Sequence, residues 1–194
     1  MTHALLVSGH PDLDASYANA TIVRSLADAL PDVTVHRLDL ARGAGHRFDL
    51  AVEGALLDAA DVVVLGSPFY WYSWSGLMQE WVEQVWDHGW ACNSLGGLAL
   101  DGKPFILSLT AGGDEPSYSP GGYEPHPVAD YLAPVTRTLE FVGAKLLGTV
   151  VAYDLPYRAP ELNTDKRTSY DDALAAHVER LAALIEGTTI GAAA

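Results

Sequence analysis

The chain has little cysteine, little positive charge and no long apolar stretch, and each shortage excludes a class of protein. Its 194 residues include a single cysteine, Cys92, so there is no basis for an internal disulfide framework or a cysteine-rich zinc site. Eleven Lys and Arg residues stand against 25 Asp and Glu residues, which gives a net charge of −14. This charge repels nucleic-acid backbones and anionic lipid surfaces, so we expect no nucleic-acid partner.

Apolar runs are also too short for a membrane span, which needs roughly 18 residues. Residues 1–7 lack the basic segment and the long apolar segment of a secretion signal, so we expect a cytoplasmic protein. Hydrophobic residues nevertheless make up 49% of the chain, enough to build a core without cross-links. We expect one domain over residues 1–187 and a disordered tail over 188–194.

Short apolar runs alternate with helical patterns along the chain, as in parallel α/β folds. The clearest strand is the run 61–67, which is apolar on both faces, as buried parallel strands are. The pattern predicts a doubly wound, five-stranded parallel sheet with helices on both faces. The expected strands cover 4–8, 33–38, 61–67, 103–110 and 146–153, and the expected helices cover 16–30, 52–60, 75–87, 129–141 and 169–185.

Ligands bind such sheets beyond the carboxyl ends of the strands, which directs attention to segments 9–19, 68–75 and 110–126. In the first segment a helix begins at the candidate N-cap Ser16, and N–H groups at a helix start attract anions. The segment has no Lys or Arg and matches neither G-x-G-x-x-G nor G-x-x-x-x-G-K-[ST]. An anion held there would depend on N–H dipoles, Ser16 and His10. An ordinary capped loop is the alternative.

His10 also allows a metal interpretation, because Pro11, Asp12 and Asp14 follow it. The segment resembles the A-H-P-D-D-E zinc motif of LmbE-like deacetylases. Leu13 interrupts the acidic pair, however, and the chain has no downstream histidine pair with ligand spacing. We therefore expect no metal site and keep a zinc-dependent deacetylase as the weakest alternative.

The second and third segments differ in character. Aromatic residues dominate 68–75, where they could form walls for a planar ligand or part of a subunit interface. In 110–126, paired glycines permit close approach of the backbone to a ligand. Tyr118, Tyr123 and His126 could donate protons there or could simply anchor the loop.

The expected helix 75–87 has a wide apolar stripe. One core-facing helix usually needs a narrower stripe, so we interpret the excess as a dimer surface. The alternative is a helix buried on most of its circumference. The stripe consists of Trp74, Leu77, Met78, Trp81, Val82, Val85 and Trp86.

In their order and spacing, these segments resemble the flavodoxin-like NAD(P)H:quinone oxidoreductases, and in particular the short ancillary oxidoreductases of glutathione-gated potassium-efflux systems. The resemblance extends from residue 5 to about residue 185. It implies a flavodoxin fold with strand order 2-1-3-4-5, a bound flavin and a homodimer. Its elements are Gly9-His10-Pro11, Ser16-Tyr17-Ala18-Asn19, Pro68-Phe69-Tyr70-Trp71-Tyr72-Ser73, residues 81–91, Leu100-Asp101-Gly102-Lys103 and Thr110-Ala111-Gly112-Gly113.

The resemblance also implies roles for single residues. Tyr118 and His126 would be the catalytic pair at the flavin carbonyl edge, with Tyr123 competing for the place of Tyr118. The sequence departs from relatives at Tyr70, where they often carry Gln, and at Ala111, where they often carry Thr. The implied flavin-binding residues are His10, Ser16, Tyr17, Ala18, Asn19, Pro68, Phe69, Tyr70, Trp71, Tyr72, Thr110, Ala111, Gly112 and Gly113.

The chain lacks the long C-terminal extension of larger relatives, which favours FMN as the cofactor, with FAD as the alternative. The implied activity is a two-electron, ping-pong reduction of a small quinone-like acceptor, with NAD(P)H as the electron donor. A flavin-binding regulatory subunit of a potassium-efflux transporter is the second possibility that the resemblance implies.

Overall fold

The fold is built on a five-stranded parallel sheet with the order β2-β1-β3-β4-β5. The computed structural model describes residues 2–86, 90–91, 99–157 and 164–191, so Cys92 and the end of the expected helix 75–87 lie outside the described residues. The predicted fold class and strand order are confirmed. The strands are β1 (Ala4–Ser8), β2 (Val33–Arg37), β3 (Val62–Pro68), β4 (Pro104–Thr110) and β5 (Lys145–Ala152).

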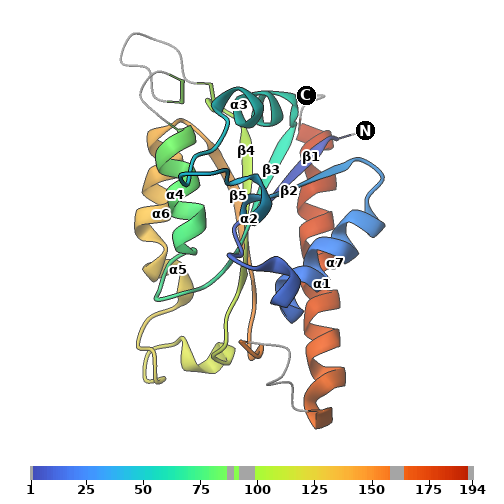
Figure 1. The fold of residues 1–194 in the computed structure, drawn as a ribbon. Helices are drawn as coiled ribbons and strands as arrows, with labels where there is room; N and C mark the ends of the chain where they lie inside the picture. Colours follow the sequence, from blue (N-terminus) through green and yellow to red (C-terminus); the bar gives the residue numbers. More distant parts are fainter. Residues whose placement is uncertain (1, 87–89, 92–98, 158–163, 192–194) are drawn as a thin grey trace.

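Helices cover both faces of the sheet (Figure 1). Helices α1 and α7 pack together on one face, and α3, α4 and α6 lie on the other. The helices are α1 (Tyr17–Ala29), α2 (Leu38–Ala41), α3 (Leu50–Ala59), α4 (Gly76–Val85), α5 (Val128–Tyr131), α6 (Ala133–Phe141) and α7 (Arg167–Gly191), with short 3-10 turns η1 (Leu13–Ala15), η2 (Glu115–Ser117) and η4 (Thr164–Lys166).

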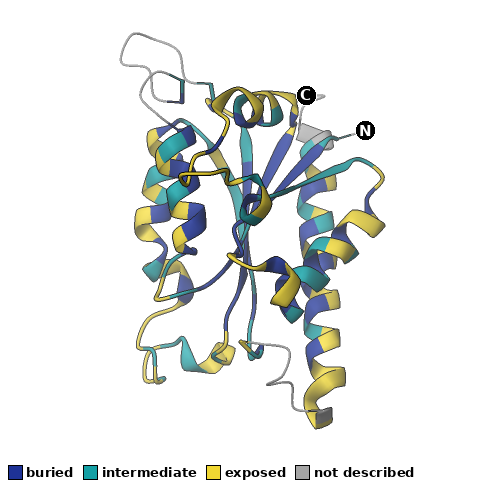
Figure 2. Cartoon of the chain, in the orientation of Figure 1, coloured by how far each residue is buried: buried dark blue, intermediate teal, exposed yellow. Residues whose placement is uncertain are grey.

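The central strands are buried on both sides, because alternate side chains of a strand point to opposite faces. In β1, Leu5 and Val7 enter the core beneath α4, whereas Ala4 and Leu6 enter the core beneath α1 and α7. Figure 2 shows the resulting band of buried residues between the two helix layers. The carboxyl ends of the strands lie at the bottom of Figure 1, and the loops that follow them come together there.

Helix α4 corrects one expectation. All seven residues of its apolar stripe are buried within the chain, at 8% exposure or less. The interpretation of the excess as a dimer surface is therefore wrong. The stripe is wide because α4 packs on the sheet while α2 and α3 pack against its flanks. Trp81 shows this tight packing, since its indole Nε1–H donates to the buried Glu53 carboxylate at 2.8 Å.

Two other helices differ from their expected bounds. The expected helix 129–141 is two helices that meet at Leu132, because Pro134 near the start of α6 has no N–H to continue the helical ladder. Helix α7 continues past the expected end at 185 to Gly191, so part of the expected disordered tail is helical. Gly187 does not stop this helix, since a helical glycine costs only about 1 kcal/mol. Among the described helices, none has both the length and the apolar character required to cross a bilayer.

A buried histidine links α7 to the sheet. The ring Nε2 of His177 lies 2.8 Å from the hydroxyl of Ser108 in β4, and both residues are buried. Burial, assisted by the nearby Arg180, lowers the pKa of His177 from 6.5 to about 4. The native protein therefore holds this imidazole neutral where an unfolded chain would protonate it.

This burial predicts that acid destabilises the fold through His177. Between about pH 6.5 and pH 4 the unfolded chain binds more protons than the native chain, so the free energy of unfolding falls as the pH falls. The loss across that window is about 3 kcal/mol. Urea unfolding at several pH values should show this loss in the natural chain and much less of it in His177→Gln. Parallel pH profiles for the two chains would contradict the prediction.

Candidate functional site

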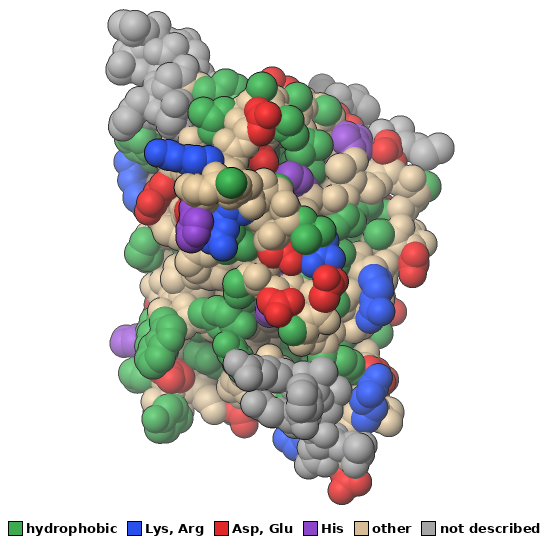
Figure 3. All heavy atoms as spheres, in the orientation of Figure 1, with side chains coloured by type: hydrophobic (Ala, Val, Ile, Leu, Met, Phe, Trp, Pro, Cys, Tyr) green, Lys and Arg blue, Asp and Glu red, His purple; other side chains and the backbone are tan. Residues whose placement is uncertain are grey.

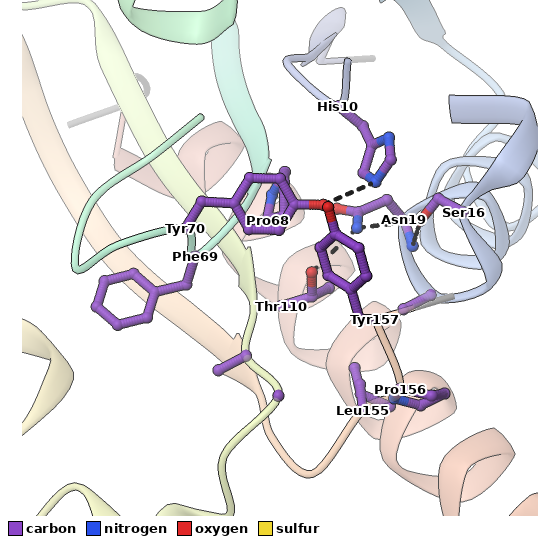
Figure 4. A pocket seen from close by; sticks show the side chains of 13 residues that line it. His10, Ser16, Asn19, Pro68, Phe69, Tyr70, Thr110, Leu155, Pro156 and Tyr157 are labelled. Atoms are coloured by element: carbon purple, nitrogen blue, oxygen red, sulfur yellow. Dashed lines mark hydrogen bonds between the residues drawn. The ribbon is translucent and has the colours of Figure 1, made fainter. Parts of the chain in front are cut away.

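A small pocket opens at the carboxyl edge of the sheet, where the loops after β1, β3, β4 and β5 meet (Figure 4). Its volume is about 120 Å³. The lining residues come from four separate parts of the sequence, and only the parallel sheet brings these together. They are His10, Ser16, Ala18, Asn19, Pro68, Phe69, Tyr70, Thr110, Ala111, Gly112, Leu155, Pro156 and Tyr157.

The floor of the pocket is polar and its side chains are fixed by hydrogen bonds. Ser16 caps α1, and its Oγ accepts the backbone N–H of Asn19 at 3.1 Å. The Asn19 amide donates to Oγ1 of Thr110 at 3.0 Å, which ties α1 to the end of β4. All three residues are at most 8% exposed. Because the first N–H groups of a helix have no intrahelical acceptor, those of Tyr17 and Ala18 remain available to a ligand.

His10 forms one wall of the pocket and is neutral. Its Nδ1 accepts the backbone N–H of Asp12 at 3.1 Å, so the ring proton resides on Nε2. Burial lowers the pKa of His10, against smaller opposing effects from Asp12 and Asp39. Nε2 faces the pocket, 3.5 Å from the hydroxyl of Tyr70. His10 therefore presents an N–H donor to this cavity at neutral pH.

Two tyrosines narrow the mouth of the pocket. Figure 4 shows Tyr70 reaching from the end of β3 toward His10, while Tyr157 approaches from the loop after β5. The rings of Tyr70 and Tyr157 lie 5.6 Å apart, centroid to centroid, at an angle of 44°. Both rings line the pocket.

The donor set indicates what the pocket can hold. None of the described lining residues is Lys or Arg, so the available donors are hydroxyls, an imidazole N–H and the start of α1. Such neutral donors at a helix N-terminus suit a phosphate group. A cavity of 120 Å³ is well below the roughly 300–1,000 Å³ of sites for drug-sized ligands. It therefore fits the phosphate end of a mononucleotide, whose planar ring would lie beyond the mouth.

A group of aromatic side chains adjoins the pocket through Phe69. Phe69 lines the pocket and also contacts Tyr72, Tyr118 and Tyr131, with ring centroids between 6.0 and 6.4 Å apart. Tyr72 and Tyr131 lie 4.9 Å apart, and Tyr118 lies 5.8 Å from Tyr153. We call Phe69, Tyr72, Tyr118, Tyr131 and Tyr153 the aromatic cluster.

The turn between Phe69 and α4 has an unusual backbone. Trp71 and Tyr72 have φ values of 48° and 68°, and Ser73 N–H donates to Tyr70 O at 3.2 Å. These values define a type I′ turn, which normally carries Asn and Gly. Each left-handed non-glycine residue costs of order 1–2 kcal/mol. Strain of this kind concentrates at functional sites, and here it holds an aromatic pair at the pocket rim.

Most of the residues that the family resemblance selected lie in this pocket, and four do not. The Tyr17 hydroxyl donates to Asp171 of α7, so its side chain leaves the pocket. Trp71 is 92% exposed, and Tyr72 belongs to the aromatic cluster. Gly113 lies against the ring of Tyr118. Those that line the pocket are His10, Ser16, Ala18, Asn19, Pro68, Phe69, Tyr70, Thr110, Ala111 and Gly112.

The candidate proton donors occupy different environments. Tyr118 contacts Phe69 and Tyr153, whereas Tyr123 is 90% exposed, so the structure brings Tyr118 to the aromatic cluster. Burial, followed by the Glu124 charge, raises the pKa of Tyr118. His126 is exposed, lies 3.8 Å from Asp130 through its Nδ1 and contacts the Tyr131 ring edge. It does not line the pocket.

Sequence reasoning missed Leu155, Pro156 and Tyr157. These residues follow β5, and only the segments after the first, third and fourth strands were considered. The same strand-end rule applied to the fifth strand would have found them. They reach the pocket because β5 pairs with β4, and the Leu155 N–H donates to Ala111 O at 3.1 Å.

The structure also bears on the interpretation of His10 as a metal ligand. The ring nitrogen nearest Asp12 accepts a backbone hydrogen bond, which is a turn contact. Within residues 2–86, 90–91, 99–157 and 164–191, no group of three or more His, Cys, Asp or Glu side chains is arranged to hold a metal ion.

Comparison with known proteins agrees with this fold. A family model described as a flavodoxin-like fold matches residues 2–178, and the chain belongs to this flavodoxin-like family. Among relatives, the glutathione-regulated potassium-efflux system ancillary protein KefG of Serratia proteamaculans is 34% identical over 170 residues, covering 88% of this chain and 91% of the relative. YrkL of Bacillus subtilis, named as an uncharacterized NAD(P)H oxidoreductase, is 31% identical over 149 residues, covering 77% and 84% of the two chains.

Solved structures share the fold. General stress protein 14 of Treponema denticola, in complex with FMN, superposes with a TM-score of 0.81 at 24% identity, covering 94% of this chain and 99% of the other. An NADPH-quinone reductase from P. pentosaceus gives a TM-score of 0.72 at 20% identity, with coverages of 92% and 96%. The expected relationship to flavodoxin-like oxidoreductases is confirmed.

Proposed function

We propose that the chain is a flavin-dependent NAD(P)H oxidoreductase with FMN as its cofactor. The observation that carries the proposal is the continuity of the two parts of the site. A buried pocket of neutral donors at the start of α1 joins the aromatic cluster through Phe69, which belongs to both. One part suits a phosphate and the other a planar ring, as FMN requires. The relative YrkL is named as an NAD(P)H oxidoreductase, which supports the same class.

The chain's own residues divide the work of binding. Ser16, His10 and the first-turn N–H groups of α1 would hold the phosphate, and Asn19 keeps Ser16 and Thr110 in place. The ring would lie against Phe69 and the backbone of Gly112 and Gly113. When bound, FMN supplies two-electron transfer between NAD(P)H and an acceptor. Because its pKa is raised, Tyr118 retains its proton at neutral pH and can donate a hydrogen bond to developing negative charge.

FMN binding is the first test. Purified or reconstituted protein should show flavin absorption, and FMN should bind more tightly than FAD because the mouth is narrow. His10→Ala should weaken FMN binding about tenfold through loss of a buried donor. His46→Ala, an exposed histidine on the loop between α2 and α3, is the matched control. Failure to bind either flavin, measured by fluorescence titration, would contradict the proposal.

Kinetics provide the second test. Donor and acceptor would use the same place beside the ring in turn, so we expect ping-pong kinetics with quinone acceptors. Parallel lines should appear in double-reciprocal plots when both substrates are varied, and converging lines would count against a shared place.

The same assays examine Tyr118 and His126, which we propose as the catalytic pair. Tyr118→Phe and His126→Ala should slow the NAD(P)H half-reaction, Tyr118→Phe by about tenfold, since a positioned donor contributes at least that much. Tyr123→Phe removes the same group from an exposed position and should leave the rate unchanged. Equal rates for Tyr118→Phe and Tyr123→Phe would remove Tyr118 from the mechanism.

A homodimer is part of the proposal, although α4 no longer supports it. The supporting feature is the exposure of two aromatic side chains, Trp71 and Tyr123, since aromatic residues are enriched at interfaces. A monomeric mass at micromolar concentration in light scattering would contradict the dimer.

A regulatory subunit of a potassium-efflux transporter is the second candidate. Its specific support is the 34% identity to KefG over most of both chains. A chain that binds FMN and yet reduces no acceptor at a useful rate would favour this candidate over the enzyme.

A further inference from the structure

The loop between β4 and α5 holds one carboxylate, that of Glu124, in a defined place. Glu124 N–H donates to Ser117 O at 2.9 Å, which folds the loop back on itself beside Tyr118. Gly122 makes this closure possible, because a Cβ there would lie 2.4 Å from Ser117 O. The position of Glu124 is therefore set by the backbone.

The carboxylate of Glu124 lies within the aromatic cluster. Tyr72 donates its hydroxyl hydrogen to Oε1 at 3.2 Å, and the Tyr131 hydroxyl lies 3.5 Å from Oε2. The hydrogen bond to Glu124 is the main cause of a raised pKa for Tyr72. Phe69 contacts both tyrosines and also lines the pocket, so the negative charge stands beside the rim where the proposed ring would emerge.

The surroundings add negative charge and provide little compensation. Residues 110–131 contain four acids and no Lys or Arg, and residues 67–75 carry no charged side chain. Lys166 is paired with Asp154 at 2.9 Å, and its charge also acts on Asp114. Figure 3 shows apolar and acidic side chains together over these loops at lower left. The acids of residues 110–131 are Asp114, Glu115, Glu124 and Asp130.

We propose that Glu124 selects the electron acceptor, favouring planar aromatic cations over acceptors with an anionic substituent. The proposal rests on the proposed oxidoreductase function and names its acceptor class. A flat cation can meet tyrosine ring faces and the carboxylate together, and both contacts are attractive to positive charge. An anionic group would meet repulsion from Glu124, and residues 67–75 and 110–131 contribute no Lys or Arg to offset it.

The chemistry of such an acceptor is consistent with turnover. A phenothiazinium cation that gains one hydride equivalent, supplied by NAD(P)H, becomes a neutral leuco compound, and the donor becomes NAD(P)⁺. Reduction therefore removes the charge that Glu124 attracts. The neutral product should therefore dissociate more readily than the cationic, oxidised dye.

If Glu124 had a purely structural role, the outcome would differ. The variant Glu124→Gln distinguishes this role from the selection of acceptors. Glu124→Gln keeps a carbonyl oxygen to accept from Tyr72 and removes only the charge. If Glu124 merely anchors the tyrosines, this variant should behave like the natural chain. Glu83→Gln, on the exposed face of α4, makes the same change in net charge away from the site and is the matched control.

Dye binding tests the proposal without relying on turnover. Methylene blue, a phenothiazinium cation, is titrated into the full chain loaded with FMN, or as purified if FMN does not bind. We expect Glu124→Gln to bind the dye about tenfold more weakly, with the difference shrinking at high salt, and Glu83→Gln to match the natural chain. Equal affinities of the natural chain and Glu124→Gln, or no binding by the natural chain, would overturn the proposal.

Acceptor kinetics extend the test to catalysis. The ratio of kcat/KM for methylene blue to that for anthraquinone-2-sulfonate should fall at least about tenfold in Glu124→Gln, while the value for uncharged menadione changes little. An unchanged ratio would overturn the selection of acceptors by Glu124. Loss of FMN binding or of NAD(P)H oxidation in the natural chain would instead count against the proposed function, so the two failures are distinguishable.

Discussion

Burial of the central strands on both faces is the constraint on which the rest of the structure depends. Strands β1, β3 and β4 carry mostly apolar side chains toward both helix layers, so both faces of the sheet are largely occupied by the core. Parallel pairing then places every carboxyl end at one edge. The loops after β1, β3, β4 and β5 therefore all begin at this edge. Polar and strained groups gather there because the core excludes them.

The proposed phosphate site at this edge lies in a protein with a negative net charge. The pocket has no Lys or Arg among its described lining residues, and it offers a capped helix start, hydroxyls and a neutral imidazole. Such dipoles would bind the proposed phosphate through their placement, which does not require a positive net charge in a protein with a charge of −14. The aromatic cluster next to it has a different balance, since one carboxylate receives a tyrosine hydroxyl and residues 67–75 and 110–131 contain no Lys or Arg. Under the proposed function, the two halves of the site would therefore differ in the charge of the groups that they favour.

The comparison of sequence and structure shows where local patterns stop being informative. The run 61–67 identified β3 because β-branched residues on both faces reflect a fully buried strand. The stripe on α4 correctly indicates that the helix is buried, but it does not indicate what buries it. The covering elements belong to the same chain, since α2 and α3 contact α4. The break at Leu132 was in principle readable from Pro134, which cannot extend the helical ladder. The strand order came from the family resemblance, since strand patterns alone do not state which strands are neighbours.

By itself, the sequence determined the α/β class, the order of its elements and three of the four loops that form the pocket. These follow from periodicity, helix caps and turn residues, which are properties of neighbouring positions in the chain. Only the tertiary structure brought Tyr157 to the mouth, assigned Tyr118 rather than Tyr123 to the aromatic cluster and placed Glu124 within reach of Tyr72. Each of these contacts joins residues from separate loops. Their distances depend on how the sheet aligns the ends of its strands and on the close approach of the backbone at Gly122 to Ser117.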